Sequence, residues 1–327
     1  MTNSCEQIKT EYENLKTLKE EFDLEYQKAI ETGNLEKVRE MKAELEEKRD
    51  ALQEKLFVSP EKAKEIMGNE DFLGQEAVEI AFGIKLNKQE IPRIPFKKEE
   101  LERAKELGQF LVLRTDKASD GQSLTMEKMN EFLQTEFQQR NKGKILYDID
   151  WHKDEDFFKK DTPKLEWALT SKEVIPNSTS KNHLEQTGII ADYLKNQVFK
   201  DKQLPKQYEE AIQEFNQYHQ DNFQNKTKGE IKTIIKSNRK EYAQQLSELK
   251  INRLTRQSVS EALYDILIYF QNNNQRLLEN KFTWTKRSSS DGALVHIGYF
   301  NSEGADVNRW HLETADGRLG VSFSRGL

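Results

Sequence analysis

Apolar residues recur at steps of three and four through the first part of the chain, the spacing of an amphipathic helix. The spacing holds over residues 8–30 and 35–56, on either side of Gly33, which can end one helix, and Asn34, which can cap the next. The pattern therefore predicts a helical hairpin, with the features of a coiled coil, in residues 1–58.

A second helical stretch begins at Ser59 and Pro60, where Ser59 is a suitable cap and Pro60 suits the first position of a helix. Helical spacing covers residues 60–82 and 97–108, and the proline-rich segment between them favours extended backbone. We expect residues 59–104 to form a helical connector.

Short apolar runs replace the helical spacing after Gln109. The runs at residues 110–113, 144–149 and 165–170 are typical of strands. Residues 182–250 are helical again and rich in Gln and Asn, and Thr227 with Glu230 can form a capping box. We interpret residues of about 180–250 as a helical insertion in a mixed domain that covers residues 105–327.

The pattern changes once more toward the C-terminus. Ser258 and Glu261 form a second predicted capping box, followed by a helix apolar enough to be buried. Strands are expected at residues 282–285, 293–300 and 319–324. The last two should be neighbours in one sheet, with Trp284 close to it. The chain as a whole is predicted to be α+β.

Composition narrows the classes of function. The 327 residues include 57 acidic and 51 basic side chains, a net charge of −6, which argues against a nucleic acid as partner. The single cysteine, Cys5, excludes an intrachain disulfide and a cysteine-based zinc site. No apolar run is long enough for a membrane span, and the first residues lack the apolar core of a secretory signal. Cytoplasmic residence is the default expectation, with surface display left open.

The C-terminal part resembles the variable proteins of diversity-generating retroelements, especially those of uncultured candidate-phylum bacteria. The resemblance is strongest over residues 256–327 and looser over residues 105–255. It rests on the order and spacing of six segments: Glu261–Asp265, Tyr269–Asn273, Thr283–Thr285, Ser289–Gly292, Leu319–Val321 and Ser324–Arg325. It implies a C-type-lectin-like domain and a variable region of about residues 288–325, in which the retroelement rewrites adenine-containing codons while the scaffold stays fixed.

Side chains within that region mix aromatic and polar groups, as recognition surfaces do. We expect a non-enzymatic site for a protein or other macromolecular ligand, without cofactor or metal. Alternation along the strand places Val295 inside and His296 outside, and Leu319 and Val321 should also point inward. Trp310 is as readily a core residue as a surface one. The expected site residues are His296, Tyr299, Phe300, Asn301, Ser302, Asn308, Trp310, His311, Glu313, Thr314 and Arg318.

Two other functions remain open from the sequence. The chain can be an interaction or scaffold protein that binds partners, or forms a homo-oligomer, through residues 5–57. It can also be an enzyme, or carry a metal, at the acidic segment Asp148–Asp156, with His183 or His219 in support. That segment lacks the spacing of an EF-hand loop, and the chain has no glycine-rich phosphate loop and no His-Glu-x-x-His motif.

Overall fold

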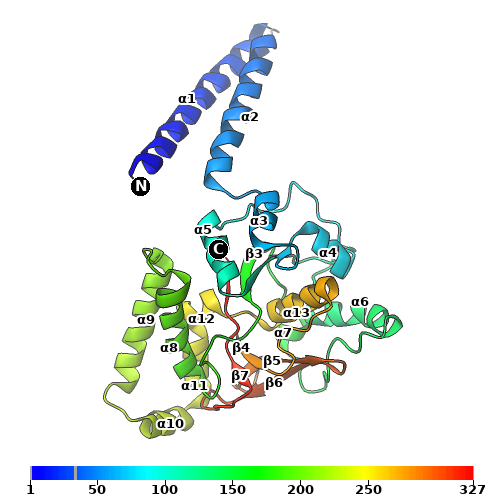
Figure 1. Ribbon diagram of the computed structural model, residues 1–327, viewed down its shortest axis with the longest axis vertical. Coiled ribbons are helices and arrows are strands. Elements are labelled where there is room, and N and C mark those ends of the chain that lie inside the picture. Colours follow the sequence, from blue (N-terminus) through cyan, green and yellow to red (C-terminus); the bar gives the residue numbers. More distant parts are fainter. Residues whose placement is uncertain (1, 33–34, 327) are drawn as a thin grey trace. The chain divides into compact units, whose positions relative to one another are not determined.

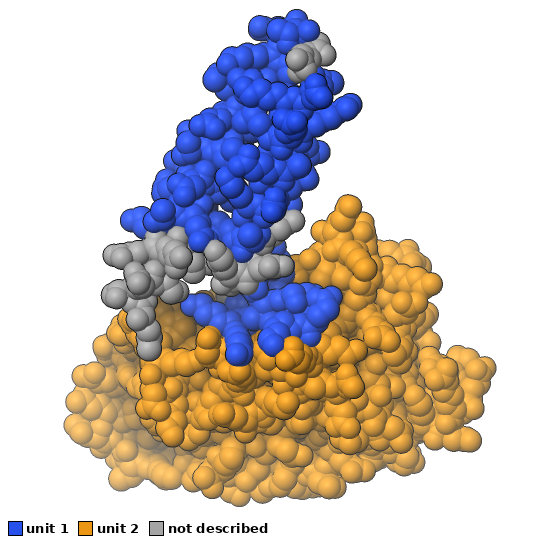
Figure 2. Space-filling model, turned by 45° about the horizontal axis from the view of Figure 1, so that its top comes forward, with its two compact units in different colours: residues 1–63, 93–98 blue, residues 64–92, 99–327 orange. Residues whose placement is uncertain are grey.

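The computed structural model describes residues 2–32 and 35–326, which fall into two compact units (Figure 2). The first unit comprises residues 1–63 and 93–98, and the second comprises residues 64–92 and 99–327. The predicted helix junction at Gly33 and Asn34 lies outside the described residues. Across the part of the chain that is described, every helix is too short or too polar to cross a bilayer.

The first unit is built on two helices, α1 (Thr2–Thr32) and α2 (Glu36–Leu56), which pack along each other. Val38 and Leu52 are buried, as their place in the apolar stripes predicts, whereas Tyr26 and Ile30 of the first stripe are exposed and Ala29 is buried between the helices' apolar positions instead. An ion pair of 3.2 Å between Glu25 and Lys37 joins the two helices. Both predicted helices of the hairpin are therefore present.

The second unit is α+β, with two four-stranded sheets. The first sheet has the order β1-β2-β3-β8 and consists of β1 (Phe72–Leu73), β2 (Gln109–Arg114), β3 (Glu166–Ser171) and β8 (Ser324–Arg325). Strand β1 runs parallel to β2, and the other pairs are antiparallel. The strands predicted at residues 110–113 and 165–170 are confirmed.

The second sheet has the order β6-β5-β4-β7 and consists of β4 (Phe282–Ser288), β5 (Leu294–Asn301), β6 (Gly304–Trp310) and β7 (Leu319–Gly320). The prediction of neighbouring strands at residues 293–300 and 319–324 was wrong in detail. Strand β4 lies between β5 and β7, and it carries Trp284 within the sheet itself. The last predicted strand is also divided, because residues 324–325 leave this sheet and pair with β3.

The remaining helices belong to five groups along the chain. They are α3 (Pro60–Met67), α4 (Gln75–Phe82) and α5 (Lys98–Glu106); α6 (Met126–Gln139) and α7 (Asp156–Lys159); α8 (His183–Tyr193), its π-helical extension η1 (Leu194–Val198) and α9 (Lys206–Phe223); α10 (Lys228–Ser237), α11 (Arg239–Glu248) and α12 (Lys250–Thr255); and α13 (Val259–Asn273).

Local sequence signals explain where several of these helices begin and end. The capping boxes predicted at Thr227 and Ser258 are both present. The helix expected over residues 60–82 is interrupted, since Gly68 takes a positive φ of 91° after α3. The strand expected over residues 144–149 is reduced to a single bridge at Leu146.

Helix α13 packs against strands of both sheets, among them β2 and β5. Its residues 259–270 are all buried, as its apolar sequence predicts. One buried polar contact fixes it to the first sheet: the guanidinium of Arg114 donates to both carboxylate oxygens of Asp265, at 3.0 and 2.6 Å. Arg114 also donates to the hydroxyl of Ser324 on β8, at 2.9 Å. The C-terminal strand is thus tied into the core.

Helices α8 to α12 gather beside the second sheet (Figure 1). Leu184 on α8 and Leu246 on α11 share one apolar cluster with Trp284 and Leu294 of the sheet. The helical insertion therefore covers part of this sheet, on the face opposite α13.

Candidate functional site

Strands β4, β5 and β6 form an antiparallel meander with short turns. In the β4–β5 turn the carboxylate of Asp291 accepts from the hydroxyl of Ser289 at 2.6 Å and from the amide of Ala293 at 3.1 Å. In the β5–β6 turn Gly304 has a φ of 104°, and a Cβ there would lie 2.5 Å from the backbone of Leu146. Only glycine fits that position.

The pairing of the strands sorts their side chains onto two faces. His296 on β5 lies opposite Trp284 on β4 and opposite Asn308 on β6, so these three share one face of the sheet. Val295 and Ile297 point the other way and are fully buried. The inward orientation predicted for Val295, Leu319 and Val321 is confirmed, since all three have no exposed surface.

Aromatic rings cover the face that carries His296. The imidazole lies 4.9 Å from the ring of Phe282, 5.3 Å from that of Trp284 and 4.5 Å from that of Trp310, between centroids. Tyr299 stacks on Phe282 at 4.7 Å. These contacts join the three strands through their side chains, beyond the hydrogen bonds of the sheet.

His296 is buried completely, so its expected exposure was wrong. Alternation places it on the correct face, but the helical insertion and Trp310 cover that part of the face. Neither ring nitrogen has a hydrogen-bond partner among the described residues. Burial lowers the pKa of His296 to about 3, because the apolar surroundings disfavour the charged ring.

Phe300 and Glu313 are further corrections. Phe300 is fully buried, packs against Phe270 of α13 at 5.3 Å and lies beneath the guanidinium of Arg276. Glu313 retains 9% of its surface, and its Oε1 accepts from Arg239 of α11 at 2.6 and 2.8 Å. Both side chains hold the fold together: Phe300 packs on α13, and Glu313 ties the loop after β6 to the insertion.

The other expected residues are exposed or half-buried, and they fall into separate places. Asn301 and Ser302 lie at the β5–β6 turn, where the carbonyl of Ser302 accepts from the amide of Lys144 at 3.0 Å. Asn301 and Ser302 therefore lie at one end of strands β5 and β6, and Trp310 lies at the other end. The eleven predicted positions therefore do not form one continuous surface.

Four of the predicted residues form a patch on the face of the sheet that carries His296. We define the aromatic patch as Tyr299, Asn308, Trp310 and Arg318. Asn308 and Arg318 are exposed, and the two rings are half-buried. The guanidinium of Arg318 lies 5.8 Å from the centre of the Tyr299 ring, and Asp316 fixes it through bonds of 3.0 and 3.1 Å. The patch thus offers two aromatic surfaces, an amide and a cation.

A hollow of about 350 Å³ adjoins the patch at Trp310. We call it the Trp310 hollow; it is lined by Asp291, Ala293, Arg309, Trp310, His311 and Thr314. Trp310, His311 and Thr314 are on the predicted list. The ion pair between Asp291 and Arg309 was not predicted from the sequence. Arg309 donates to Asp291 at 2.8 Å and lies 4.4 Å from the ring of Trp151. The alternation of side chains between the two faces of β6, which places Val307 and Arg309 on the same face, is the sequence signal that could have identified this strand.

The backbone of the aromatic patch is strained at Tyr299. Tyr299 has a φ of 48°, which is costly for a residue with a bulky side chain. It follows Gly298, where the pairing of β5 with β6 is irregular. A Cβ at Gly298 would lie 2.0 Å from the carbonyl oxygen of Lys281, which accepts the Tyr299 amide at 2.9 Å. The close approach requires glycine at position 298 and directs the Tyr299 ring onto Phe282.

The acidic segment does not assemble with either histidine proposed to support it. His152 within the segment is buried among Trp151, Phe157 and Phe158, and burial lowers its pKa to about 4. His183 lies against Trp284, and His219 contacts aromatic rings of α9. Within residues 2–32 and 35–326, no group of three or more His, Cys, Asp or Glu side chains is placed to hold a metal ion.

Comparison of the chain with protein-family models, with curated proteins and with solved structures found no match. The arguments about function therefore rest on the residues of the aromatic patch and the Trp310 hollow, and on their place in the fold.

Proposed function

We propose that the chain is a non-enzymatic binding protein that displays a diversified surface near its C-terminus, in the manner of the variable proteins of diversity-generating retroelements. The ligand is a protein or another macromolecule, and it binds at the aromatic patch and the Trp310 hollow. The variable region of residues 288–325 supplies all of the residues in both.

The observation that carries this proposal is the half-exposed ring of Trp310. Large aromatic side chains at the centre of a patch, flanked by adaptable polar groups, are the usual anchors of protein interfaces. Trp310 borders both the patch and the hollow, and His296 and Phe282 beneath it are packed. Side chains at the rim can therefore change while the support beneath them stays the same.

The arrangement of the strands supports a C-type-lectin-like core. Strand β8 returns to the first sheet beside β3, and the meander β4–β6 precedes it in the chain. In this interpretation the helices α8 to α12 are an insertion, and the two-helix unit at the N-terminus is an addition.

Population sequencing tests the proposal directly. The segment that encodes residues 288–325 would be sequenced from many cells, and the surrounding genome searched for a reverse-transcriptase gene and a near-copy of the segment. We expect substitutions at adenine-containing codons for the exposed and half-buried positions, Tyr299, Asn308 and His311 among them. Val295 and Val321 should be invariant, because random replacement of a buried residue typically costs about 2–5 kcal/mol.

Two results would contradict the proposal. One is a segment without variation and without a neighbouring reverse transcriptase. The other is variation spread equally over buried and exposed positions, since a surface selected for exchange must be separate from the packing that holds the fold.

A second function, that of a scaffold protein, has one observation in its favour. Tyr12, Leu24 and Ile30 of α1 are 57%, 60% and 61% exposed, which is unusual for three large apolar side chains of one helix. A second copy of α1 and α2 could cover them. Light scattering on the full chain and on a Leu24→Glu, Ile30→Glu variant tests this function: a dimer that the variant dissociates supports it, and a monomer in both cases rules out self-association through these residues.

A further inference from the structure

A second hollow, distinct from the Trp310 hollow, lies on the other side of the β4–β5 turn. It measures about 640 Å³, and we call it the basic hollow. Its walls come from the loop after α7, from α11 and α12, from the N-terminal cap of α13 and from the end of β4 with the turn that follows. It lies entirely within the second unit.

Positive charge dominates the lining. Six cationic side chains line the basic hollow: Lys160, Lys164, Lys240, Arg253, Lys286 and Arg287. Only two carboxylates, Asp161 and Glu248, accompany them. The chain as a whole has a net charge of −6, so this concentration of cations runs against the overall composition. A concave surface lined by one sign of charge raises the local concentration of ions of the other sign.

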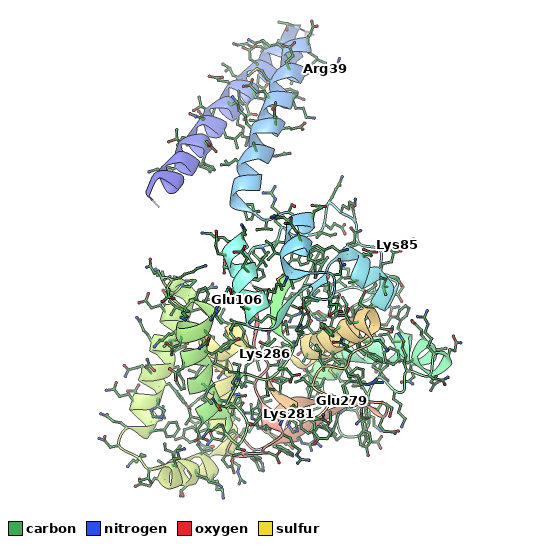
Figure 3. All side chains as sticks on the ribbon, in the orientation of Figure 1. Arg39, Lys85, Glu106, Glu279, Lys281 and Lys286 are labelled. Carbon is green, nitrogen blue, oxygen red and sulfur yellow. The ribbon has the colours of Figure 1, made fainter. Side chains whose placement is uncertain are left out.

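Several contacts make the walls rigid. Arg287 forms two bonds of 2.6 Å with Asp161, which join the end of β4 to the loop after α7. Lys286 pairs with the buried Glu261 of α13 at 3.0 Å (Figure 3, where Lys286 is labelled). Gly292, with a φ of 84°, brings the turn so close to α11 that a Cβ would lie 2.8 Å from the Lys240 side chain.

Three of the cations are not neutralised by the protein. Within the described residues, Lys164, Lys240 and Arg253 have no carboxylate at ion-pairing distance, although Lys160, Lys286 and Arg287 do. The three come from different elements, and all are exposed to the solvent of the hollow. Holding like charges around one cavity costs free energy that an anion in that cavity would recover.

Hydroxyl groups supply the other donors. Ser288 and Thr162 line the basic hollow, and within the described residues neither hydroxyl makes a hydrogen bond to the protein, whereas the hydroxyls of Ser247, Ser258 and Ser289 are already bonded to it. Ser258 is the cap of the 15-residue helix α13, and its amide donates to the carboxylate of Glu261 at 2.7 Å. No aromatic side chain is present in the lining, so the hollow has no surface on which a nucleobase could stack.

We propose that the basic hollow binds a compact, phosphate-rich anion, of which pyrophosphate and tripolyphosphate are the simplest forms. Lys164, Lys240 and Arg253 supply the charge, and the hydroxyls of Ser288 and Thr162 donate hydrogen bonds to the phosphate oxygens. Ser288, Ser289 and Gly292 of the lining fall within residues 288–325, but the three unpaired cations lie outside that range and outside the aromatic patch and the Trp310 hollow.

Calorimetry on the full chain with tripolyphosphate tests the proposal. We expect saturable binding of one tripolyphosphate per chain at low ionic strength, with weaker binding as salt is added. The variant Lys164→Gln, Lys240→Gln, Arg253→Gln should lose about tenfold or more in affinity. All three side chains are exposed, so its thermal unfolding midpoint should match that of the wild type.

A matched control removes the same charge elsewhere. Lys88, Lys232 and Lys236 are exposed and lie outside the basic hollow, and their replacement by Gln should weaken binding by less than about threefold through the change in net charge alone. Absence of saturable binding, or an equal loss in both triple variants, overturns the proposal.

A comparison with ATP distinguishes free oligophosphate from a nucleotide. Because the lining has no aromatic side chain, ATP should bind no more than about threefold tighter than tripolyphosphate. A preference for ATP of about tenfold or more would overturn the assigned ligand class, since the base would then contribute to recognition.

Discussion

The buried imidazole of His296 makes the stability of the second unit depend on pH in a predictable direction. Its ordinary pKa is 6.5, and burial lowers it to about 3 in the folded chain. Between these values the unfolded chain binds a proton that the folded chain does not. Stability is therefore highest above pH 6.5 and falls as the pH is lowered toward 3.

The size of the effect follows from the two values. At pH 5 the unfolded histidine is almost fully protonated and the folded one is neutral, which costs about 2 kcal/mol relative to pH 7.5. His152, whose pKa burial lowers to about 4, contributes about 2 kcal/mol more over the same range. The sum is a large fraction of the roughly 5–15 kcal/mol by which a typical domain is stable.

Urea denaturation at pH 7.5, 6.5, 5.5 and 5.0 measures the effect. Trp151, Trp167, Trp284 and Trp310 are the only tryptophans and all lie in the second unit, so their fluorescence reports its unfolding. The variant His296→Leu should lose about 2 kcal/mol less than the wild type between pH 7.5 and 5. At pH 7.5 it should be about as stable, because the imidazole makes no hydrogen bond that leucine would remove.

The control is His311→Gln, in which an exposed histidine of the Trp310 hollow is replaced. Its pH dependence should follow that of the wild type, because the replaced side chain is exposed and the buried His296 is unchanged. If His296→Leu also retains the full dependence of the wild type, His296 is not the buried neutral group inferred here and the packing around it is different.

Three further predictions concern the fold. Asp265→Ala should lower the free energy of unfolding by about 3–5 kcal/mol in urea, because it removes both short bonds to a buried guanidinium and leaves it only the carboxylate of Glu166, at 3.3 Å; a loss below about 1 kcal/mol would mean that the network is solvated. The double variant Asn308→Ser, His311→Ser should leave the thermal midpoint nearly unchanged, whereas Val321→Ser should lower it by several degrees, and the reverse order would show that the patch is core. Deletion of residues 1–57 should leave a soluble chain with one cooperative unfolding transition, because most packing of the second unit is internal; aggregation would show that the hairpin is part of the core.

Local signals in the sequence were sufficient for much of the secondary structure. The capping boxes at Thr227 and Ser258 depend only on residues three apart, and both are present. The apolar runs of β2 and β3 are short and continuous, as buried strands should be. Strand β6 was missed although Ala305 and Val307 alternate with polar neighbours, because its polar residues had been assigned to recognition loops.

The site was harder to predict than the elements that carry it. Alternation placed His296 on the correct face of the sheet, but burial of that face depends on Leu184 and Leu246 in the insertion, far away in the chain. The role of Glu313 likewise depends on Arg239. Period and composition describe one segment at a time, and neither tells which face of a sheet a distant helix will cover.

The return of β8 to the first sheet has a consequence for protein synthesis. Ser324 contacts Thr170 and Arg114 across 154 and 210 positions of the chain, and β7 at Leu319–Gly320 completes the edge of the second sheet. A nascent chain in which translation stops before these residues lacks a strand of each sheet, and its unpaired edges are exposed. A frameshift or stop codon anywhere in residues 288–325 should therefore give a chain that cannot complete its core and is open to proteolysis. Only messages read in frame through residue 325 would therefore yield folded protein.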